Sequence, residues 1–213
     1  MKIAIIGATG YVGSKLLAEA LARKHEVTAL VSRPERIPAG STARAEKTDV
    51  LDTAALASQL QGQDVVITAF SGHAQGDQTY DYYVRGIKSI IAAAKQAHVK
   101  RLLVVGGAGS LEVAPGVQAV DTPEFPAEWK QSALGAREAL NLLRQEQELN
   151  WSMLSPAAYL VPGERTGKFR LGRDQMLVDA KGESRISVED YAVAMLNEAE
   201  QEQHSRSRFT AAY

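Results

Sequence analysis

Residues 1–15, MKIAIIGATGYVGSK, decide the fold of this chain. We expect a strand at residues 2–6, because the run Ile3–Ile6 is apolar without alternation, which is typical of a strand covered on both faces. Gly7, Gly10 and Gly13 follow at intervals of three residues, and a helical pattern begins directly after them. This order of strand, glycine-rich turn and helix predicts an α/β protein with a ligand site at the carboxyl end of its first strand.

Each glycine of this turn has a separate part in binding a dinucleotide pyrophosphate. Gly7 permits the tight turn off the strand, Gly10 lets the main chain approach the phosphates, and Gly13 lets the helix pack closely on the sheet. The helix N-terminus adds free N–H donors and a partial positive charge. The first interval is one residue longer than in the general G-x-G-x-x-G fingerprint, and a purely structural turn is the alternative. The strand before the turn and the helix after it favour the coenzyme site.

The bulk properties are those of an ordinary globular protein. The length fits a single domain, residues 1–213, with small substrate-side elements at about 112–128 and 159–185. A net charge of −1 gives no reason to expect nucleic acid or a membrane as a partner. The absence of cysteine excludes disulfides and thiolate catalysis, and we expect no metal. Because the N-terminus lacks the pattern of a signal peptide, we expect a cytoplasmic protein. We expect it to be either a monomer or a homodimer.

Helical and strand patterns alternate along the rest of the chain. We expect further strands at 26–31, 44–48, 64–70, 100–105 and 151–155, and helices at 11–24, 53–60, 80–97, 127–147 and 188–200. Capping residues mark two of these helices, Asp52 before the second and Ser187 before the last. Strands that follow helices so closely lie parallel to one another through right-handed crossovers, so the pattern predicts a doubly wound parallel sheet.

The less regular segments are expected to form loops and short strands. Three prolines exclude a regular helix from residues 112–128, and we expect a loop at the rim of the site. Residues 169–171 and 176–178 are expected to pair as a hairpin, and 208–210 to add an edge strand. The four basic residues of 163–173 are either a solvated face or, as the minority interpretation, partners of an anionic ligand.

The end of the second strand indicates which coenzyme is bound. In this architecture a carboxylate there binds the ribose 2′-OH of NAD, whereas an arginine accommodates a 2′-phosphate. The chain has Ser32 and Arg33 at this position and no carboxylate at the strand end. Ser32 can donate a hydrogen bond, and Arg33 can hold phosphate with its planar fork. The sequence therefore favours NADP(H) over NAD(H), with a solvated Arg33 close to Glu35 as the alternative.

Polar residues follow the other strands at the same edge of the sheet. Asp49, after the third strand, is placed either to accept from the adenine amino group or to make a turn. His73 lies in the polar loop after the fourth strand, where it is either a substrate ligand or, more commonly for such a histidine, solvated. Ser110 places a hydroxyl after the fifth strand, near the expected nicotinamide ribose.

Four motifs together resemble the atypical short-chain dehydrogenase/reductases: GATGYVG at 7–13, Ser-Arg-Pro at 32–34, GGAG at 106–109 and SPAA at 155–158. The chain is more closely similar to the single-domain NADH-flavin reductase group, which is related to biliverdin-IXβ/flavin reductase and to NmrA-like proteins. The resemblance covers nearly the whole chain. It implies a single-domain Rossmann-type fold, with helices on both faces of the sheet and a small C-terminal substrate-covering segment.

The resemblance also implies which residues hold the coenzyme. They are Gly7, Thr9, Gly10, Tyr11 and Val12 for the pyrophosphate, Ser32 and Arg33 for the 2′-phosphate, Asp49 and Val50 for the adenine, Ala69, Phe70 and Ser71 for the path from adenosine to nicotinamide, and Gly107, Ala108, Pro156, Ala157, Ala158 and Tyr159 for the nicotinamide side. Ser110 matches the serine that follows the fifth strand in the flavin-reductase relatives.

One departure from the wider family bears on the chemistry. Short-chain dehydrogenases generally use a Y-x-x-x-K pair, in which the lysine lowers the pKa of the tyrosine. Neither Tyr159 nor Tyr191 has a lysine four residues on. The pair Tyr11–Lys15 has the spacing but belongs to the pyrophosphate helix. We therefore do not expect a typical alcohol dehydrogenase or sugar epimerase.

The missing pair favours an acceptor that needs no dedicated acid. Hydride transfer to a conjugated ring depends chiefly on proximity, because solvent can protonate the reduced ring. The sequence predicts an NAD(P)H-dependent reductase of a flavin (FMN or FAD as substrate), a quinone or a similar planar acceptor. The candidate catalytic residues are Ser110, to polarise the acceptor, and Lys130, as an electrostatic helper. The alternative is a non-catalytic, NmrA-like redox sensor that binds NADP(H).

Overall fold

The chain forms a main sheet flanked by helices, in a computed structural model that describes residues 1–72 and 76–213 and the main-chain path of residues 73–75. The parallel strands are β1 (Lys2–Ile6), β2 (Glu26–Val31), β3 (Arg44–Lys47), β4 (Val65–Thr68), β5 (Arg101–Val105), β8 (Trp151–Pro156) and β12 (Ser207–Ala212). Strand β10 (Arg170–Gly172) joins the same sheet antiparallel. The α-helices are α1 (Tyr11–Ala22), α2 (Thr53–Leu60), α3 (Thr79–Gln96), α4 (Ala127–Gln145) and α5 (Val188–Gln201).

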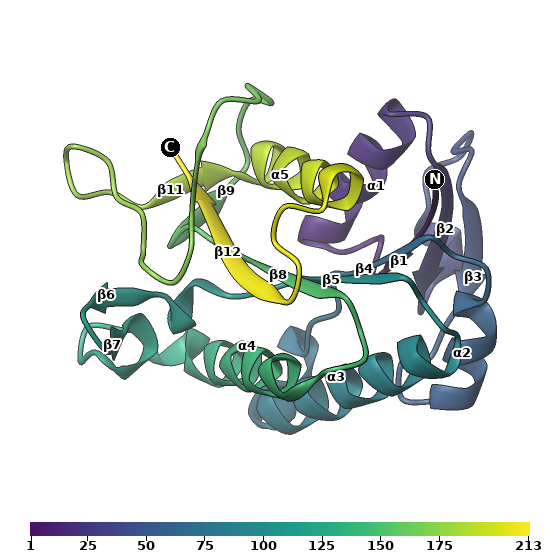
Figure 1. Cartoon of the computed structure of the whole chain (residues 1–213), viewed down its shortest axis with the longest axis horizontal. Helices are drawn as coiled ribbons and strands as arrows, with labels where there is room; N and C mark the ends of the chain where they lie inside the picture. Colours follow the sequence, from purple (N-terminus) through teal and green to yellow (C-terminus); the bar gives the residue numbers. More distant parts are fainter.

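The order of the strands across the sheet is β10-β12-β8-β5-β4-β1-β2-β3. Without β10 and β12 this is the order of a dinucleotide-binding sheet, in which the winding reverses between β1 and β4. Helices α1 and α5 cover one face of the sheet, and α2, α3 and α4 cover the other (Figure 1). The predicted fold class, a single-domain Rossmann-type doubly wound parallel sheet with helices on both faces, is confirmed.

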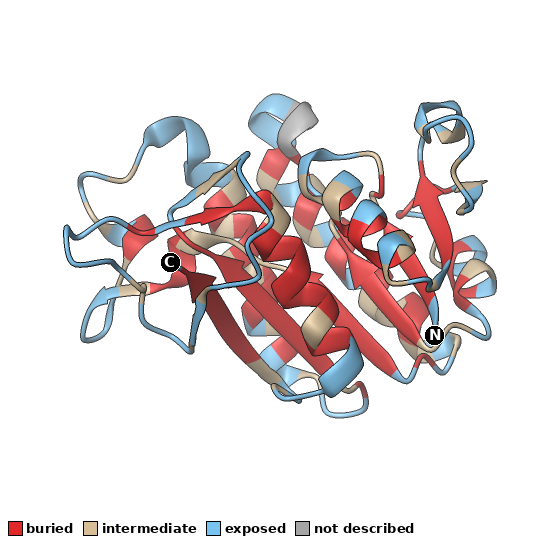
Figure 2. Cartoon of the chain, turned by 90° about the horizontal axis from the view of Figure 1, so that it is seen from above, coloured by how far each residue is buried: buried red, intermediate tan, exposed pale blue. Residues whose placement is uncertain are grey.

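Strand β1 is buried on both faces. Ile3 and Ile5 pack into the core shared with α1 and α5, whereas Ala4 and Ile6 pack into the core shared with the three helices opposite. None of these four side chains is more than 1% exposed, and Figure 2 shows the centre of the sheet buried along its strands. Each buried isoleucine stabilises the fold by about 1.5 to 3 kcal/mol. Burial on both faces explains why the apolar residues of β1 follow one another without alternation.

The two predicted helix caps are confirmed. The Asp52 carboxylate accepts from the Ala55 amide at 3.0 Å, and the Ser187 hydroxyl accepts from the Asp190 amide at 3.0 Å. These bonds satisfy N–H groups that have no partner within their own helix. The Asp190 carboxylate accepts from the Gly167 amide at 2.7 Å, so it fastens the segment before α5.

The predicted hairpin of residues 169–171 with 176–178 is wrong. Strand β10 pairs with β12 instead, with Leu171 opposite Ala211. The amide of Met176 donates to the carbonyl of Glu112 at 2.9 Å. The main sheet offers β10 a long neighbouring strand, whereas an isolated two-stranded hairpin is marginally stable in water. The prediction of an edge strand at residues 208–210 is also wrong, since β12 lies between β8 and β10.

The expected loop at residues 112–128 contains a short antiparallel pair. Strand β6 (Glu112–Ala114) turns back at Pro115 and Gly116 into β7 (Val117–Gln118). Gly116 has a φ of 73°, a conformation that glycine adopts readily. The loop prediction was therefore wrong for β6 and β7. Residues 112–126 form no α-helix, as predicted, and α4 begins at Ala127.

A second small sheet lies beside α5. It consists of β9 (Tyr159–Val161) and β11 (Arg185–Ser187), which pair in parallel (Figure 1). Strand β9 begins the segment 159–185 that the sequence predicts to be on the substrate side, and β11 begins at its last residue. Within the described residues, none of the helices has the length and apolar character needed to span a bilayer.

Candidate functional site

The turn from β1 into α1 lies against the end of β2 and the residues that follow β4. The amide of Gly7 donates to the carbonyl of Leu30 at 2.8 Å. Gly7 has a φ of 79°, and a Cβ on it would lie 2.9 Å from the Ala69 carbonyl oxygen. A Cβ on Gly13 would lie only 2.0 Å from the Gly7 carbonyl oxygen. The turn therefore has no room for side chains at these two positions, and it sits where the winding of the sheet reverses.

The first turn of α1 keeps its N–H groups free of side-chain caps. Its N-cap is Gly10, which provides no side-chain hydrogen bond, and its first turn carries no acidic residue. Helix α2, in contrast, is capped by the Asp52 carboxylate. The N–H groups that begin a helix have no intrahelical partner and attract anions. The residues present thus fit a pyrophosphate: the turn bears no bulk at Gly7, Gly10 and Gly13, and Thr9, Tyr11 and Val12 complete the predicted cradle.

The residues predicted for the 2′-phosphate, Ser32 and Arg33, lie directly after β2 and are both exposed. Among the described residues, none forms a hydrogen bond or ion pair with the Arg33 guanidinium, and Glu35 does not pair with it either. The main-chain carbonyl of Arg33 accepts from the Arg36 amide at 3.1 Å, which fixes the position of its backbone. The guanidinium is therefore available to an anionic group at this end of the site.

The structure gives Asp49 the turn role that was one of its two alternatives. Its Oδ1 accepts from the Leu51 amide at 2.9 Å. The carboxylate is exposed, and the neighbouring Val50 is only 8% exposed. Contact with the adenine stays a prediction for both residues.

Phe70 occupies the middle of the predicted coenzyme path, between the half-buried Ala69 and the exposed Ser71. Its ring stacks on that of Tyr83, with 5.8 Å between the ring centroids and 8° between their planes. A Cβ on Gly86 would lie 2.2 Å from the Phe70 ring, so Gly86 makes room for it. The sequence reasoning missed Gly86, although a glycine inside a helical pattern is itself a signal of close packing.

On the nicotinamide side, helix α4 packs against the loop that follows β5. A Cβ on Gly107 would lie 3.0 Å from the Cβ of Ala136, and one on Gly109 would lie 2.7 Å from the Cβ of Ala133. Ala108, between the two glycines, is half-buried. Lys130 is exposed and lies one helical turn before Ala133, so the structure brings it to the same end of the sheet as this loop.

The end of β8 completes the predicted nicotinamide side. Pro156 and Ala157 are buried, whereas Ala158 is exposed and Tyr159 is 63% exposed. Ser110 is only 2% exposed, and its hydroxyl accepts from the Arg208 guanidinium at 3.2 Å. Arg208 is a residue of this region that the sequence reasoning missed, because nothing in a strand pattern shows what a buried arginine contacts.

Two of the four basic side chains in residues 163–173 have partners within the protein. Arg165 donates to both carboxylate oxygens of Glu19 at 2.7 Å, and Arg170 donates to the carbonyls of Val178 and Tyr213. The paired Arg165 guanidinium holds the pKa of Glu19 below its usual value. These arginines fasten the segment to the rest of the fold, which leaves them little capacity for an anionic ligand. His73 lies outside the residues whose side chains are described.

Of the three tyrosines considered for a tyrosine–lysine pair, Tyr11 and Tyr191 have hydroxyl partners, whereas Tyr159 is 63% exposed. The hydroxyl of Tyr191 donates to the Leu154 carbonyl at 2.6 Å, and the residue is fully buried. The hydroxyl of Tyr11 donates to the Leu160 carbonyl at 3.2 Å. Lys15, four residues after Tyr11, forms an ion pair with Glu189 at 3.0 Å. Neither tyrosine is arranged as the acid of a tyrosine–lysine pair.

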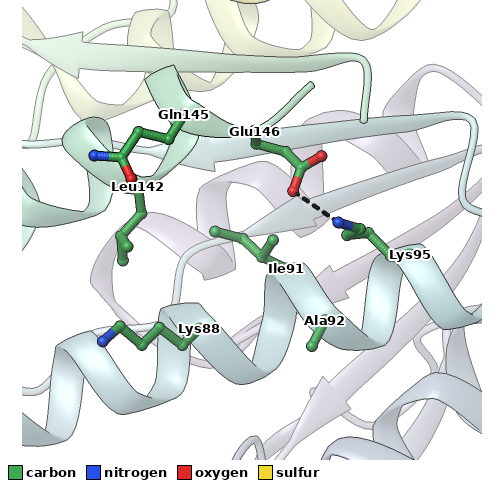
Figure 3. Close-up of a pocket in the computed structure, with 7 residues that line it drawn as sticks. All are labelled: Lys88, Ile91, Ala92, Lys95, Leu142, Gln145 and Glu146. Atoms are coloured by element: carbon green, nitrogen blue, oxygen red, sulfur yellow. Dashed lines mark hydrogen bonds and ion pairs between the residues drawn. The ribbon is translucent and has the colours of Figure 1, made fainter. Parts of the chain in front are cut away.

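A shallow hollow of about 280 Å³ lies between α3 and α4. Figure 3 shows its lining, which includes Ile91, Leu142 and the ion pair of Lys95 with Glu146 at 3.2 Å. Both helices run back from the carboxyl edge of the sheet, and the hollow lies toward their C-terminal ends. It is therefore separate from the candidate coenzyme site.

Comparison with solved structures shows close relatives over the full chain. A "Putative exported protein" of Burkholderia pseudomallei is 46% identical, with 100% of both chains covered and a TM-score of 0.90. A "putative epimerase" of Bacteroides thetaiotaomicron is 44% identical over 100% of this chain and 96% of that one, with a TM-score of 0.93. A "putative NADH-flavin reductase" of Streptococcus pneumoniae TIGR4 is 36% identical over 100% and 99%, with a TM-score of 0.84. These descriptions differ in activity, so they support a shared fold and leave the substrate open.

The family comparison agrees with the geometry of the site. The model of a family described as NAD(P)H-binding matches residues 7–199, which begin at the first glycine of the cradle. The predicted resemblance to NAD(P)-binding reductases is thereby confirmed at the level of the family. The chain belongs to the NAD(P)H-binding oxidoreductase family.

Proposed function

We propose that this protein is a reductase that prefers NADPH and transfers hydride to a free flavin, a quinone or a similar planar acceptor. The observation that carries the proposal is the side-chain-free turn at Gly7 and Gly13, with an uncapped helix N-terminus next to it. When bound, the coenzyme supplies the hydride. The chain's own part is to hold the pyrophosphate at residues 7–12 and to keep the nicotinamide side between the loop after β5 and the end of β8.

The residues on the acceptor side fit a reaction without a dedicated acid. Tyr191 and Tyr11 are both engaged with carbonyl groups. A reduced planar ring can take its proton from solvent, which a carbonyl substrate of a typical dehydrogenase cannot do as easily. Lys130, exposed at this end of α4, would stabilise negative charge on the reduced acceptor. We retain Ser110 as the candidate to polarise the acceptor, through a hydroxyl already bonded to Arg208.

Coenzyme preference gives the first test. Arg33→Ala is expected to weaken NADPH binding by about 10- to 100-fold, because a charge-assisted hydrogen bond contributes about 1.5 to 3 kcal/mol. NADH affinity should stay within about twofold, since NADH has no 2′-phosphate. Calorimetric titration of both coenzymes measures the ratio. Arg36→Ala, in the same exposed turn, is the matched control and should leave the ratio unchanged.

An unchanged ratio of NADPH to NADH affinity in Arg33→Ala would remove the proposed 2′-phosphate site. An equal loss for both coenzymes would mean that Arg33 supports the turn rather than the phosphate.

Turnover gives the second test. Stopped-flow mixing of the protein with NADPH and excess FMN, FAD or a series of quinones should show coenzyme oxidation well above the background without protein. The absence of oxidation with every acceptor would defeat the reductase proposal. Saturable binding without oxidation, together with different affinities for NADP⁺ and NADPH, would favour the redox sensor. We expect the reaction in the cytoplasm, where NADPH is available. The word "exported" in the description of the Burkholderia pseudomallei relative applies to that protein.

A further inference from the structure

Arg208 is a buried arginine on β12 whose partners lie in three segments far apart in sequence. Its side chain is 2% exposed. Burial lowers the pKa of its guanidinium, and the Asp174 carboxylate opposes this shift. An arginine stays charged in proteins even so, and a buried charge of this kind is costly unless its donors are bonded.

The hydrogen bonds of Arg208 reach each of these segments. Its Nη1 donates to the Ser110 hydroxyl at 3.2 Å and to the Ser155 hydroxyl at 3.4 Å. Its Nη2 donates to the Ser110 carbonyl at 3.4 Å and to the Asp174 Oδ1 at 2.6 Å, and its Nε donates to the same oxygen at 3.0 Å. The planar fork of the guanidinium therefore joins three chain segments in one fixed geometry.

The positions of these partners give Arg208 its significance. Ser110 ends the loop 106–110 after β5. Ser155 lies in β8, directly before residues 156–159, in which β8 ends and β9 begins. These are the two segments between which the nicotinamide side is predicted. Asp174 belongs to the segment after β10, and its carbonyl accepts from the Glu112 amide at 2.8 Å, which ties this segment to β6.

A displacement of either segment would change the distance over which hydride moves. Reacting atoms must approach within about 3 to 3.5 Å, and a misplacement of 1 Å can cost about 100-fold in rate. The carboxyl ends of β5 and β8 are already neighbours, since the Gly106 amide donates to the Leu154 carbonyl at 2.8 Å. Arg208 adds a side-chain connection between the two segments, because its Nη1 donates to the hydroxyls of both Ser110 and Ser155.

We propose that Arg208 is a positioning residue of the reductase site: its guanidinium fixes loop 106–110 against the end of β8, and Asp174 extends this connection to the segment after β10. The inference rests on the proposed function for its kinetic consequence. It assigns Ser110 a second role, as the point at which Arg208 holds the loop. Arg208 itself is enclosed and acts through these neighbours.

The test uses three variants and two controls in the full-length protein. Arg208→Met removes the donors, Arg208→Lys keeps the charge without the fork, and Asp174→Asn weakens the connection at a half-exposed position. Arg144→Met is the matched control at Asp174, because Arg144 donates to the same Oδ1 at 3.1 Å from the surface of α4. Arg101→Met is the control for losing a buried arginine, since Arg101 lies at the amino end of β5.

Three readouts separate positioning from stability. Thermal unfolding reports stability, the affinity for 2′,5′-ADP reports the adenosine half of the site, and NADPH fluorescence reports how firmly the nicotinamide ring is held. For Arg208→Met we expect an unchanged 2′,5′-ADP affinity within about twofold, a clear loss of the NADPH fluorescence enhancement, and a kcat lower by about 10- to 100-fold. Arg208→Lys and Asp174→Asn should show smaller losses of the same kind. Both controls should keep the wild-type fluorescence and kcat while folded.

Wild-type fluorescence and kcat in Asp174→Asn and in either folded Arg208 variant would overturn the inference. A loss of the same size in Arg101→Met would also overturn it, because the effect would then follow stability alone. If Arg208→Met does not fold, Arg208→Lys and Asp174→Asn decide the matter. A wild-type protein without turnover would defeat the proposed function, and the fluorescence comparison would still decide the role of Arg208. The absence of any NADPH signal in the wild type would overturn both.

Discussion

Gly13→Ala is expected to abolish tight coenzyme binding and to destabilise the fold. A methyl group at this position would lie 2.0 Å from the carbonyl oxygen of Gly7 and 2.8 Å from its carbonyl carbon. Both are main-chain atoms, so the turn itself must move away from α1. Overpacking of this kind costs about 1 to 3 kcal/mol of stability. Loss of even one or two charge-assisted bonds to the pyrophosphate adds a drop in NADPH affinity of about 100-fold.

Calorimetric titration with NADPH and urea unfolding measure these two effects. Ser14→Ala is the matched control, because Ser14 is the next residue of α1, is exposed, and donates its hydroxyl to the Tyr11 carbonyl at 3.2 Å. The control should bind NADPH within about twofold of wild type. Near-normal coenzyme affinity in a folded Gly13→Ala protein would show that close packing of the turn on the helix is not needed for binding.

Glu198→Ala is expected to give the largest loss of stability, about 3 to 5 kcal/mol, with little effect on coenzyme binding. Arg101 and Glu198 form a buried ion pair between β5 and α5. Glu198 also accepts from the His204 amide at 2.9 Å and from the Ser152 hydroxyl at 3.3 Å. Removal of the carboxylate leaves the Arg101 guanidinium buried without its main partner. Burial already lowers the pKa of Arg101, in agreement with the cost of keeping its charge in this place.

The control for this prediction lies on the same helix. Glu200 is 32% exposed and pairs with Arg23 at 2.7 Å, so Glu200→Ala should cost no more than about 1 kcal/mol. Urea unfolding of both variants gives the comparison. Equal losses for Glu198→Ala and Glu200→Ala would contradict the account of the buried pair. A large loss of NADPH affinity in folded Glu198→Ala would contradict its separation from the coenzyme site.

The local sequence pattern was sufficient for the elements that position the site. The bounds of β1, β2 and α2 agree with the predicted ranges, because each has an unbroken apolar run or a clear capping residue. The glycine spacing of the first turn predicted a close approach of the main chain, and the contacts of Gly7 and Gly13 have this form. These features depend on residues within about ten positions of one another, so a sequence contains them directly.

The features that were missed depend on contacts between distant residues. Residues 169–171 are compatible with a local hairpin, but β12 is the better neighbour and lies some forty residues later. The partner of Arg165 is Glu19, near the other end of the chain, so a solvated basic cluster could not be distinguished from a fastened one. Arg208 is the clearest case, since its three partners come together only in the folded chain. The turn at Pro115 and Gly116 was visible in the sequence and would have predicted β6 and β7.

In the proposed site, the main chain of residues 7–12 holds the pyrophosphate of a nicotinamide coenzyme. Amide NMR spectra recorded during titration with NADPH, NADH and NADP⁺ test it most directly. We expect saturable shifts of the amide signals of Thr9, Gly10, Tyr11 and Val12, with tighter saturation by NADPH than by NADH. Amide signals of these residues that stay unchanged up to millimolar coenzyme would contradict it.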